Sequence, residues 1–462
     1  MLIDCMADNK KPTNVNRRNF LKLVAAGAAT SAVAIAGCKA QSDEHSSNKP
    51  VPTDKMTYRN PFDIKDKVSI LGYGCMRLPQ KPDPKDPNNE ILDQKAINES
   101  VDYAMAHGVN YYDTSPRYCQ GESETAMGIA LSRHPRNKYF VATKLSNFDP
   151  ESQTREGSIE MYRNSFKQLK TDYIDYYLLH AIGDFDTYKA RYVDNGMLDF
   201  LIKEREAGRI RHLGWSFHGT KDFFDYMLTL PVKWDFVQIQ LNYLDWHHNT
   251  REVNADYLYG ELAKRNIPAV IMEPLLGGGL STVNYKVQEL LKQADSEATI
   301  ASWAFRFAGS LPGVLTVLSG MTYMEHLQDN LRTFAPLVPL TDKEKDMLEK
   351  CAELIAAFPE IGCTGCQYCM PCPYGIDIPG IFAHYNKCLK EGNFPSDVKD
   401  PAYDKARRAF LIGYDRSVPR LRQADHCIHC GQCLPKCPQH IEIPTEMEKI
   451  DQYVNNMKLQ NK

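Results

Sequence analysis

Eight cysteines stand in two short runs near the end of the sequence, with a spacing that suits metal ligation. The first run is CTGCQYCMPCP at 363–373, and the second is CIHCGQCLPKCP at 427–438. The second run has the C-x2-C-x2-C-x3-C-P spacing of iron–sulfur ligands. A zinc site would take paired ligands from two places, and a run this short cannot easily give four cysteines disulfide partners. We therefore expect [4Fe–4S] clusters.

The first run is one residue shorter before its last cysteine, and a crossed arrangement explains this. The expected ligands are Cys363, Cys366, Cys369 and Cys437 for one cluster and Cys427, Cys430, Cys433 and Cys372 for the other. The missing residue then changes only how Cys372 enters the second set. Both runs are followed by similar segments, IDIP and IEIP, and 54 residues separate Cys372 from Cys427. The module resembles a helical ferredoxin with two [4Fe–4S] clusters.

A second group of reactive side chains lies in the first half of the chain, where Asp113, Tyr118, Lys144 and His180 follow or end short apolar runs. A phenol donates a proton poorly at neutral pH unless a cation stabilises the phenolate. Lys144 would supply that cation, Asp113 would hold it, and His180 would orient a substrate oxygen. Any one of these residues alone has a structural explanation, such as helix capping by Asp113. Together they indicate proton delivery to a substrate.

Eight short β-type runs, alternating with helical stretches, must position these side chains. The runs are 68–74, 109–115, 139–145, 173–180, 210–216, 236–242, 269–275 and 314–320. Eight such units over about 270 residues predict a (β/α)8 TIM barrel, whose chemistry lies at the carboxyl ends of the strands. A doubly wound sheet is the alternative, but GYGCMR at 72–77 lacks the third glycine of its fingerprint.

From about residue 69 to 331 the sequence resembles the aldo-keto reductases. The matching segments include NYYDTSPRYCQGESETAMG, FVATKL, DYIDYYLLH, GRIRHLGWSFHG and FVQIQLNY. The resemblance implies that Tyr118 is the general acid for carbonyl reduction and that Asp113, Lys144 and His180 complete a tetrad. It also implies an NADP or NAD cofactor, with Ser216 and Gln238 on the carboxamide. The remaining residues of the implied cofactor site are Met272, Gly277, Gly278, Ser319 and Asn330.

Two segments depart from the family pattern. Met272 stands where the family commonly stacks a tyrosine on the nicotinamide, and PLLGGG at 274–279 would lie beside the pyrophosphate. The adenosine segment LSGMTYMEHLQDN at 318–330 lacks the Lys and Arg that many members place on the 2′-phosphate. The choice between NADP and NAD therefore stays open, as does the absence of any nicotinamide. A Pro- and Asp-rich loop at 79–90 is expected to overhang the mouth.

The first 38 residues have the layout of an export signal. Arg17 and Arg18 precede a short apolar stretch of small residues and resemble a twin-arginine signal. IAGC resembles a lipoprotein box that would lipidate Cys38, whereas AIA at 34–36 offers ordinary cleavage. Twin-arginine export carries folded proteins, which suits a chain that acquires clusters first. The expected location is the periplasm, or the membrane surface through Cys38.

The expected domains are a signal at 1–38, a linker at 39–56, a barrel at 57–340, a connecting helix at 341–360, a cluster domain at 361–448 and a tail at 449–462. The chain has 55 basic and 58 acidic residues, so it lacks the excess of positive charge that is typical of nucleic-acid-binding proteins. The expected partners are a small carbonyl or alcohol substrate and an unidentified redox partner. The predicted function is an exported oxidoreductase coupled to electron transfer, and the alternative is a non-catalytic electron carrier whose barrel is a scaffold.

Overall fold

The structure is a computed structural model of the 462-residue chain, and it describes residues 50–248, 253–357, 360–394, 398–399 and 401–459. The predicted signal at 1–38, with Arg17, Arg18 and Cys38, lies outside the described residues. Within the described ranges, no helix has the length and apolarity needed to cross a membrane.

Eight parallel strands close into a barrel, in the order β10-β11-β12-β3-β6-β7-β8-β9. The TIM-barrel prediction is confirmed, since each predicted run contributes one barrel strand. The strands are β3 (Leu71–Gly74), β6 (Tyr111–Asp113), β7 (Phe140–Leu145), β8 (Ile174–Ile182), β9 (Ile210–Phe217), β10 (Phe236–Gln240), β11 (Ala269–Met272) and β12 (Val314–Ser319).

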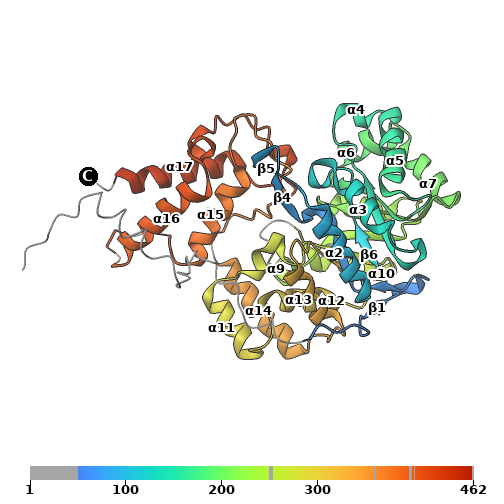
Figure 1. The fold of residues 1–462 in the computed structure, drawn as a ribbon, viewed down its shortest axis with the longest axis horizontal. Coiled ribbons are helices and arrows are strands. Elements are labelled where there is room, and N and C mark those ends of the chain that lie inside the picture. The colour runs from blue at the N-terminus through green and yellow to red at the C-terminus, as the bar shows by residue number, and fades with distance from the viewer. Residues whose placement is uncertain (1–49, 249–252, 358–359, 395–397, 400, 460–462) are drawn as a thin grey trace, which may run out of the picture. The chain divides into compact units, whose positions relative to one another are not determined.

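The barrel interior is filled by large side chains that alternate along the strands, among them Tyr111, Tyr176 and Phe236. Side chains on the outer face of the strands pack against the surrounding helices in a larger core. These helices are α2 (Gln94–Ala106), α3 (Ser123–Leu131), α4 (Pro150–Gln153), α5 (Arg155–Leu169), α6 (Phe185–Tyr188), α7 (Met197–Glu206), α8 (Lys221–Thr229), α9 (Tyr243–His247), α10 (Ala255–Lys264), α11 (Tyr285–Ala294), α12 (Ile300–Gly309) and α13 (Met324–Phe334) (Figure 1).

Short polar caps begin several of the helices. Asp93 accepts hydrogen bonds from two backbone amides at the start of α2, and Thr154 caps α5. A short antiparallel pair, β1 (Tyr58–Arg59) with β2 (Val68–Ser69), precedes the first barrel strand. These local signals fix where each element begins and so where the strand ends lie.

The Pro- and Asp-rich segment after the first barrel strand differs from its prediction as a loop. It forms an antiparallel hairpin of β4 (Gln80–Asp83) and β5 (Asp86–Leu92). Strand β4 contains one proline, Pro82, which pairs with Glu90. In a two-stranded sheet this residue need not donate a hydrogen bond, so it does not prevent the pairing.

The C-terminal module is helical, as predicted, and is coloured orange to red in Figure 1. Helix α14 (Asp342–Ala356) starts with a Thr341–Glu344 capping box, and α15 (Ile378–Lys390), α16 (Tyr403–Ser417) and α17 (Ile443–Leu459) follow. Helix α17 continues past the predicted boundary at 448, because Val454 and Met457 are buried in the module's own core.

Candidate active site and cysteine sites

The four candidate catalytic side chains lie at the carboxyl end of the barrel. Asp113 ends β6, Lys144 is the second-last residue of β7, and His180 lies near the end of β8. Tyr118 begins the short 3-10 helix that follows β6. Since parallel strands end at the same mouth, the four side chains meet there.

Lys144 and Asp113 form a buried ion pair. The Lys144 Nζ atom lies 2.6 Å from Asp113 Oδ1 and also donates to the carbonyl of Thr114 at 2.8 Å. Gln238 donates to the other carboxylate oxygen of Asp113 at 3.3 Å. Burial raises the pKa of Asp113, although Lys144 and Gln238 oppose this effect. The ammonium is therefore held in place by two protein oxygens, Asp113 Oδ1 and the Thr114 carbonyl, rather than by solvent.

Tyr118 lies against both Lys144 and His180. The Lys144 ammonium stands 4.7 Å from the centre of the Tyr118 ring, and the His180 ring lies edge-on at 5.9 Å. Burial, and then the Asp113 carboxylate, raise the pKa of Tyr118 well above its usual value. This differs from the expectation that Lys144 lowers the pKa of the phenol. Asp113 balances the ammonium, which faces the ring rather than the hydroxyl, and burial dominates.

His180 is a neutral imidazole in this environment. Burial, followed by the charge of Lys144, lowers its pKa well below the usual value. Its Nδ1 atom lies 2.5 Å from Ser146 Oγ, and its backbone carbonyl accepts a hydrogen bond from Arg191 at 2.6 Å. These bonds fix the ring, so the remaining nitrogen, Nε2, is the one that can bind a substrate oxygen.

The residues implied to hold a nicotinamide are distributed along the same mouth, and most are bonded to each other or to the barrel wall. Ser216 accepts a hydrogen bond from the amide of Ala181 at 2.7 Å, and Asn330 donates to Ser319 at 2.9 Å. Met272 ends β11. Gly277 and Gly278 have φ values of 65° and 101°, a backbone conformation that favours glycine.

Three further residues lie at the mouth that were not predicted from the sequence. They are Arg77, Glu273 and Tyr368. Tyr368 comes from the first cysteine run, and its ring lies 6.4 Å from that of Phe148, which in turn lies 5.0 Å from His180. Burial and then the proximity of Tyr118 raise the pKa of Tyr368 well above its usual value. A tyrosine between two cysteines carries no local signal that it faces another domain.

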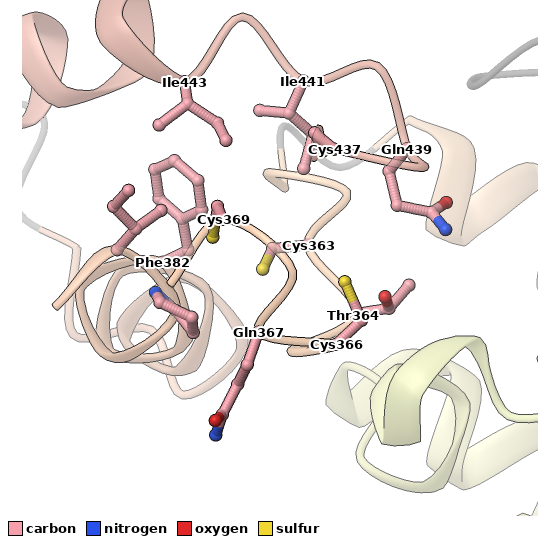
Figure 2. Close-up of a pocket in the computed structure, with 12 residues that line it drawn as sticks. Cys363, Thr364, Cys366, Gln367, Cys369, Phe382, Cys437, Gln439, Ile441 and Ile443 are labelled. Carbon is pink, nitrogen blue, oxygen red and sulfur yellow. The ribbon is translucent and has the colours of Figure 1, made fainter. Parts of the chain in front are cut away.

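The first cysteine site is a cavity of about 320 Å³, counted with its open mouth (Figure 2). Three cysteines of the first run line it together with the last cysteine of the second run. The wall is otherwise mostly apolar and includes Phe382, Ile441 and Ile443. The cysteines are Cys363, Cys366, Cys369 and Cys437.

The second cysteine site is a similar cavity of about 310 Å³. It is lined by three cysteines of the second run and the last cysteine of the first, with Ile376, Ile428 and Met447 in its wall. The cysteines are Cys372, Cys427, Cys430 and Cys433. The structure thus groups the eight cysteines into the two crossed sets. In each set, the first three cysteines of one run lie beside the last cysteine of the other run.

The donor sets fit [4Fe–4S] clusters. Each site offers four thiols, all of which are free of disulfides, around an apolar cavity. Four sulfurs on one zinc ion would lie only about 3.8 Å apart, and no group of at least three His, Cys, Asp or Glu in the described ranges could hold a single metal ion. Burial raises the pKa of Cys363 to about 11 and that of Cys369 to about 12. Cluster binding must therefore stabilise the thiolates.

Comparisons with known proteins match both modules. The model of the "Aldo/keto reductase family" matches residues 70–353, and the model of the "4Fe-4S dicluster domain" matches residues 362–442. "Probable aldo-keto reductase 1" of Glycine max is 32% identical over 157 residues, which are 32% of this chain and 42% of that protein. L-galactose dehydrogenase of Arabidopsis thaliana is 25% identical over 303 residues, 61% of this chain and 89% of that protein.

An aldo-keto reductase from Bacillus halodurans has the same barrel, with a TM-score of 0.51 at 22% identity over 64% of this chain and 96% of that chain. This likeness shows the fold. The alignment with the Glycine max protein spans less than half of that relative's length. The family model covers more than half of the residues of this chain, and a 4Fe-4S dicluster domain follows it. The chain therefore belongs to the aldo/keto reductase family.

Proposed function

We propose that this chain is an exported oxidoreductase that interconverts a small carbonyl compound and its alcohol at Tyr118. It exchanges electrons with a separate redox partner through the two cysteine sites. The observation that carries the proposal is the position of Tyr368, which belongs to the loop of the first cysteine site and lies beside Phe148 at the catalytic mouth. This contact supports a route between the cysteine sites and the proposed proton-transfer residues.

Tyr118 supplies the proton to the substrate oxygen. Because the pKa of Tyr118 is raised, the phenol is protonated at neutral pH and carries the proton to be transferred. Neutral His180 orients the same oxygen by a hydrogen bond. Lys144, held by Asp113, lies against the face of the Tyr118 ring and keeps the ring in position.

The electron count of the reaction agrees with two clusters. Reduction of a carbonyl to an alcohol takes up two electrons and two protons, with one proton from Tyr118 on oxygen and one from solvent on carbon. Cys363, Cys366, Cys369 and Cys437 would hold one [4Fe–4S] cluster, and Cys372, Cys427, Cys430 and Cys433 would hold the other. Each cluster would exchange one electron at a time, so the two sites together would supply the required pair. The external donor is a one-electron carrier, and it is oxidised as the carbonyl is reduced.

The family resemblance implies NADP or NAD as a hydride carrier at Ser216 and Gln238. Both side chains are engaged by neighbours in the barrel, Ser216 by Ala181 and Gln238 by Asp113. The roles proposed for Tyr118, His180 and Lys144 in proton transfer therefore do not depend on a bound nicotinamide.

Export by the twin-arginine route rests on the sequence of the first 38 residues, in which Arg17 and Arg18 precede a short apolar stretch of small residues. It is supported by the eight ligand thiols, because disulfide formation outside the cytoplasm would compete with cluster assembly there. Loading before export avoids that competition. Lipidation of Cys38 would hold the protein at a membrane surface.

A non-catalytic electron carrier is the second candidate, and one observation favours it. Thr364 and Tyr368 of the first cysteine run lie on the barrel mouth, so the barrel would serve as a scaffold for the clusters. The intact arrangement of Asp113, Lys144 and His180 around Tyr118 favours the enzyme, because a scaffold has no use for a buried proton donor.

Turnover of the Tyr118→Phe variant separates the two candidates. Anaerobically reconstituted full-length protein is mixed with reduced methyl viologen and a panel of small aldehydes and ketones, and oxidation of the dye is followed. Loss of the positioned proton donor should reduce turnover by about 10²- to 10⁴-fold while the iron content stays unchanged. Equal turnover of variant and wild type, or turnover by neither, would favour the carrier.

A further inference from the structure

The glycine segment that the resemblance places beside a pyrophosphate is covered by the first cysteine run. A Cβ atom built on Gly277 would stand 2.3 Å from the carbonyl oxygen of Thr364 and 2.5 Å from its Cα. Thr364 is itself buried and lies between Cys363 and Cys366. The backbone of the cluster loop therefore packs directly on the backbone of Gly277.

Contacts around this point come from three parts of the cluster module. Lys390 of α15 donates to the carbonyl of Gly279 at 3.2 Å, and Arg77 donates to the carbonyl of Thr364. Gln240, at the end of β10, donates to Gln439 at 3.4 Å in a buried position just after Cys437. Both cysteine runs thus take part in covering the mouth.

The adenosine segment also lacks side chains that would bind a phosphate. The adenosine segment at 318–330 contains Glu325 and Asp329 but no Lys or Arg. A phosphate there would lack its strongest hydrogen-bond donors.

The residues present therefore do not fit an extended nicotinamide dinucleotide. We propose that the cluster loop Cys363–Cys372 takes the place of that dinucleotide, so that the chain binds neither NADPH nor NADH at the barrel mouth. Thr364 stands on the segment expected for the pyrophosphate, and Tyr368 lies beside the catalytic residues. The inference goes beyond the proposed function, because it removes the family's hydride carrier from the site.

Direct binding tests the inference without any turnover. Cluster-loaded full-length protein is titrated with NADPH and separately with NADH by anaerobic calorimetry, up to about 1 mM nucleotide. Unchanged iron content and near-ultraviolet circular dichroism verify that the protein is folded. We expect no saturable heat and no rise in Tm with either nucleotide. Saturable binding of either nucleotide at one site per chain would overturn the proposal, whatever the protein's activity.

A matched pair of glycine variants tests the packing itself. Gly277→Ala adds a methyl group where Thr364 already stands, whereas Gly278→Ala meets nothing within 4 Å although its φ of 101° is also unfavourable for alanine. Gly277→Ala should lose iron from the first cysteine site and lower Tm well below that of Gly278→Ala. Equal iron content and equal Tm in the two variants would mean that the loop does not lie on this segment, and the proposal would fall.

Discussion

The ring of Tyr368, from the first cysteine run, lies 6.4 Å from the ring of Phe148, from the loop after β7. Phe148 also packs on His180 at 5.0 Å and lies under the guanidinium of Arg191 at 4.6 Å. A residue between two cluster ligands thus contacts the aromatic wall of the catalytic mouth. The first cysteine run therefore packs beside the candidate catalytic residues of the barrel.

Replacement of Tyr368 by alanine should loosen this junction. The side chain is partly buried, so truncation is expected to cost about 1–3 kcal/mol of unfolding free energy and to lower Tm. Tyr323→Ala is the matched control, because the Tyr323 side chain is 63% exposed. Thermal unfolding followed by circular dichroism compares the two variants. A Tyr368→Ala shift no larger than that of Tyr323→Ala would mean that the contact does not stabilise the protein.

The barrel, and the meeting of Asp113, Tyr118, Lys144 and His180 at its mouth, could be predicted from the sequence. Short β-branched and aromatic runs favour strands, and polar residues that follow parallel strands fall at the mouth. The hairpin at 80–92 was missed, since its composition resembles a loop. The contacts of Thr364 and Tyr368 with the barrel could not be predicted, because they depend on how two modules pack and not on any local pattern. The raised pKa of Tyr118 could not be predicted either, because it results mainly from burial of the side chain, which depends on the whole fold.

Asp113→Asn should destabilise the barrel strongly. Asp113 and Lys144 are 3% and 1% exposed, and loss of one member of a buried ion pair costs about 3–5 kcal/mol. The control is Asp149→Asn, because the Asp149–Arg117 pair is exposed and asparagine still caps helix α4. The Tm of Asp113→Asn should fall much further than that of Asp149→Asn. Similar shifts in both would contradict the structural role of the buried pair.

Single cysteine variants should separate the two cluster sites. Wild-type protein reconstituted without oxygen should hold about eight iron atoms, and Cys372→Ser and Cys437→Ser should each damage a different cluster. Cys372→Ser acts on the second site and Cys437→Ser on the first. Iron analysis and electron paramagnetic resonance of the reduced proteins distinguish the sites, and Cys388→Ser, a buried cysteine outside both, is the control. Unchanged spectra in both ligand variants, or zinc in place of iron, would refute the assignment.

The buried neutral state of His180 makes stability depend on pH. Its pKa in the folded protein is well below the usual value of about 6.5, so the unfolded chain takes up a proton that the folded chain does not. Stability is therefore lost as the pH falls below about 6.5, by up to about 1.4 kcal/mol per pH unit from this group. The Tm of wild type should fall more between pH 7 and pH 5.5 than that of His180→Gln. Equal falls would show that His180 is not kept neutral by the fold.

The most direct test of the account is anaerobic stopped-flow spectroscopy of the pre-reduced, cluster-loaded protein. A carbonyl compound from the active panel is mixed with it while the cluster absorbance and the alcohol product are measured. The account predicts that the clusters are re-oxidised as the alcohol forms, with one alcohol for every two electrons, and that Tyr118→Phe slows both signals together. Clusters that stay reduced in the presence of substrate, with alcohol appearing only after NADPH is added, would contradict it.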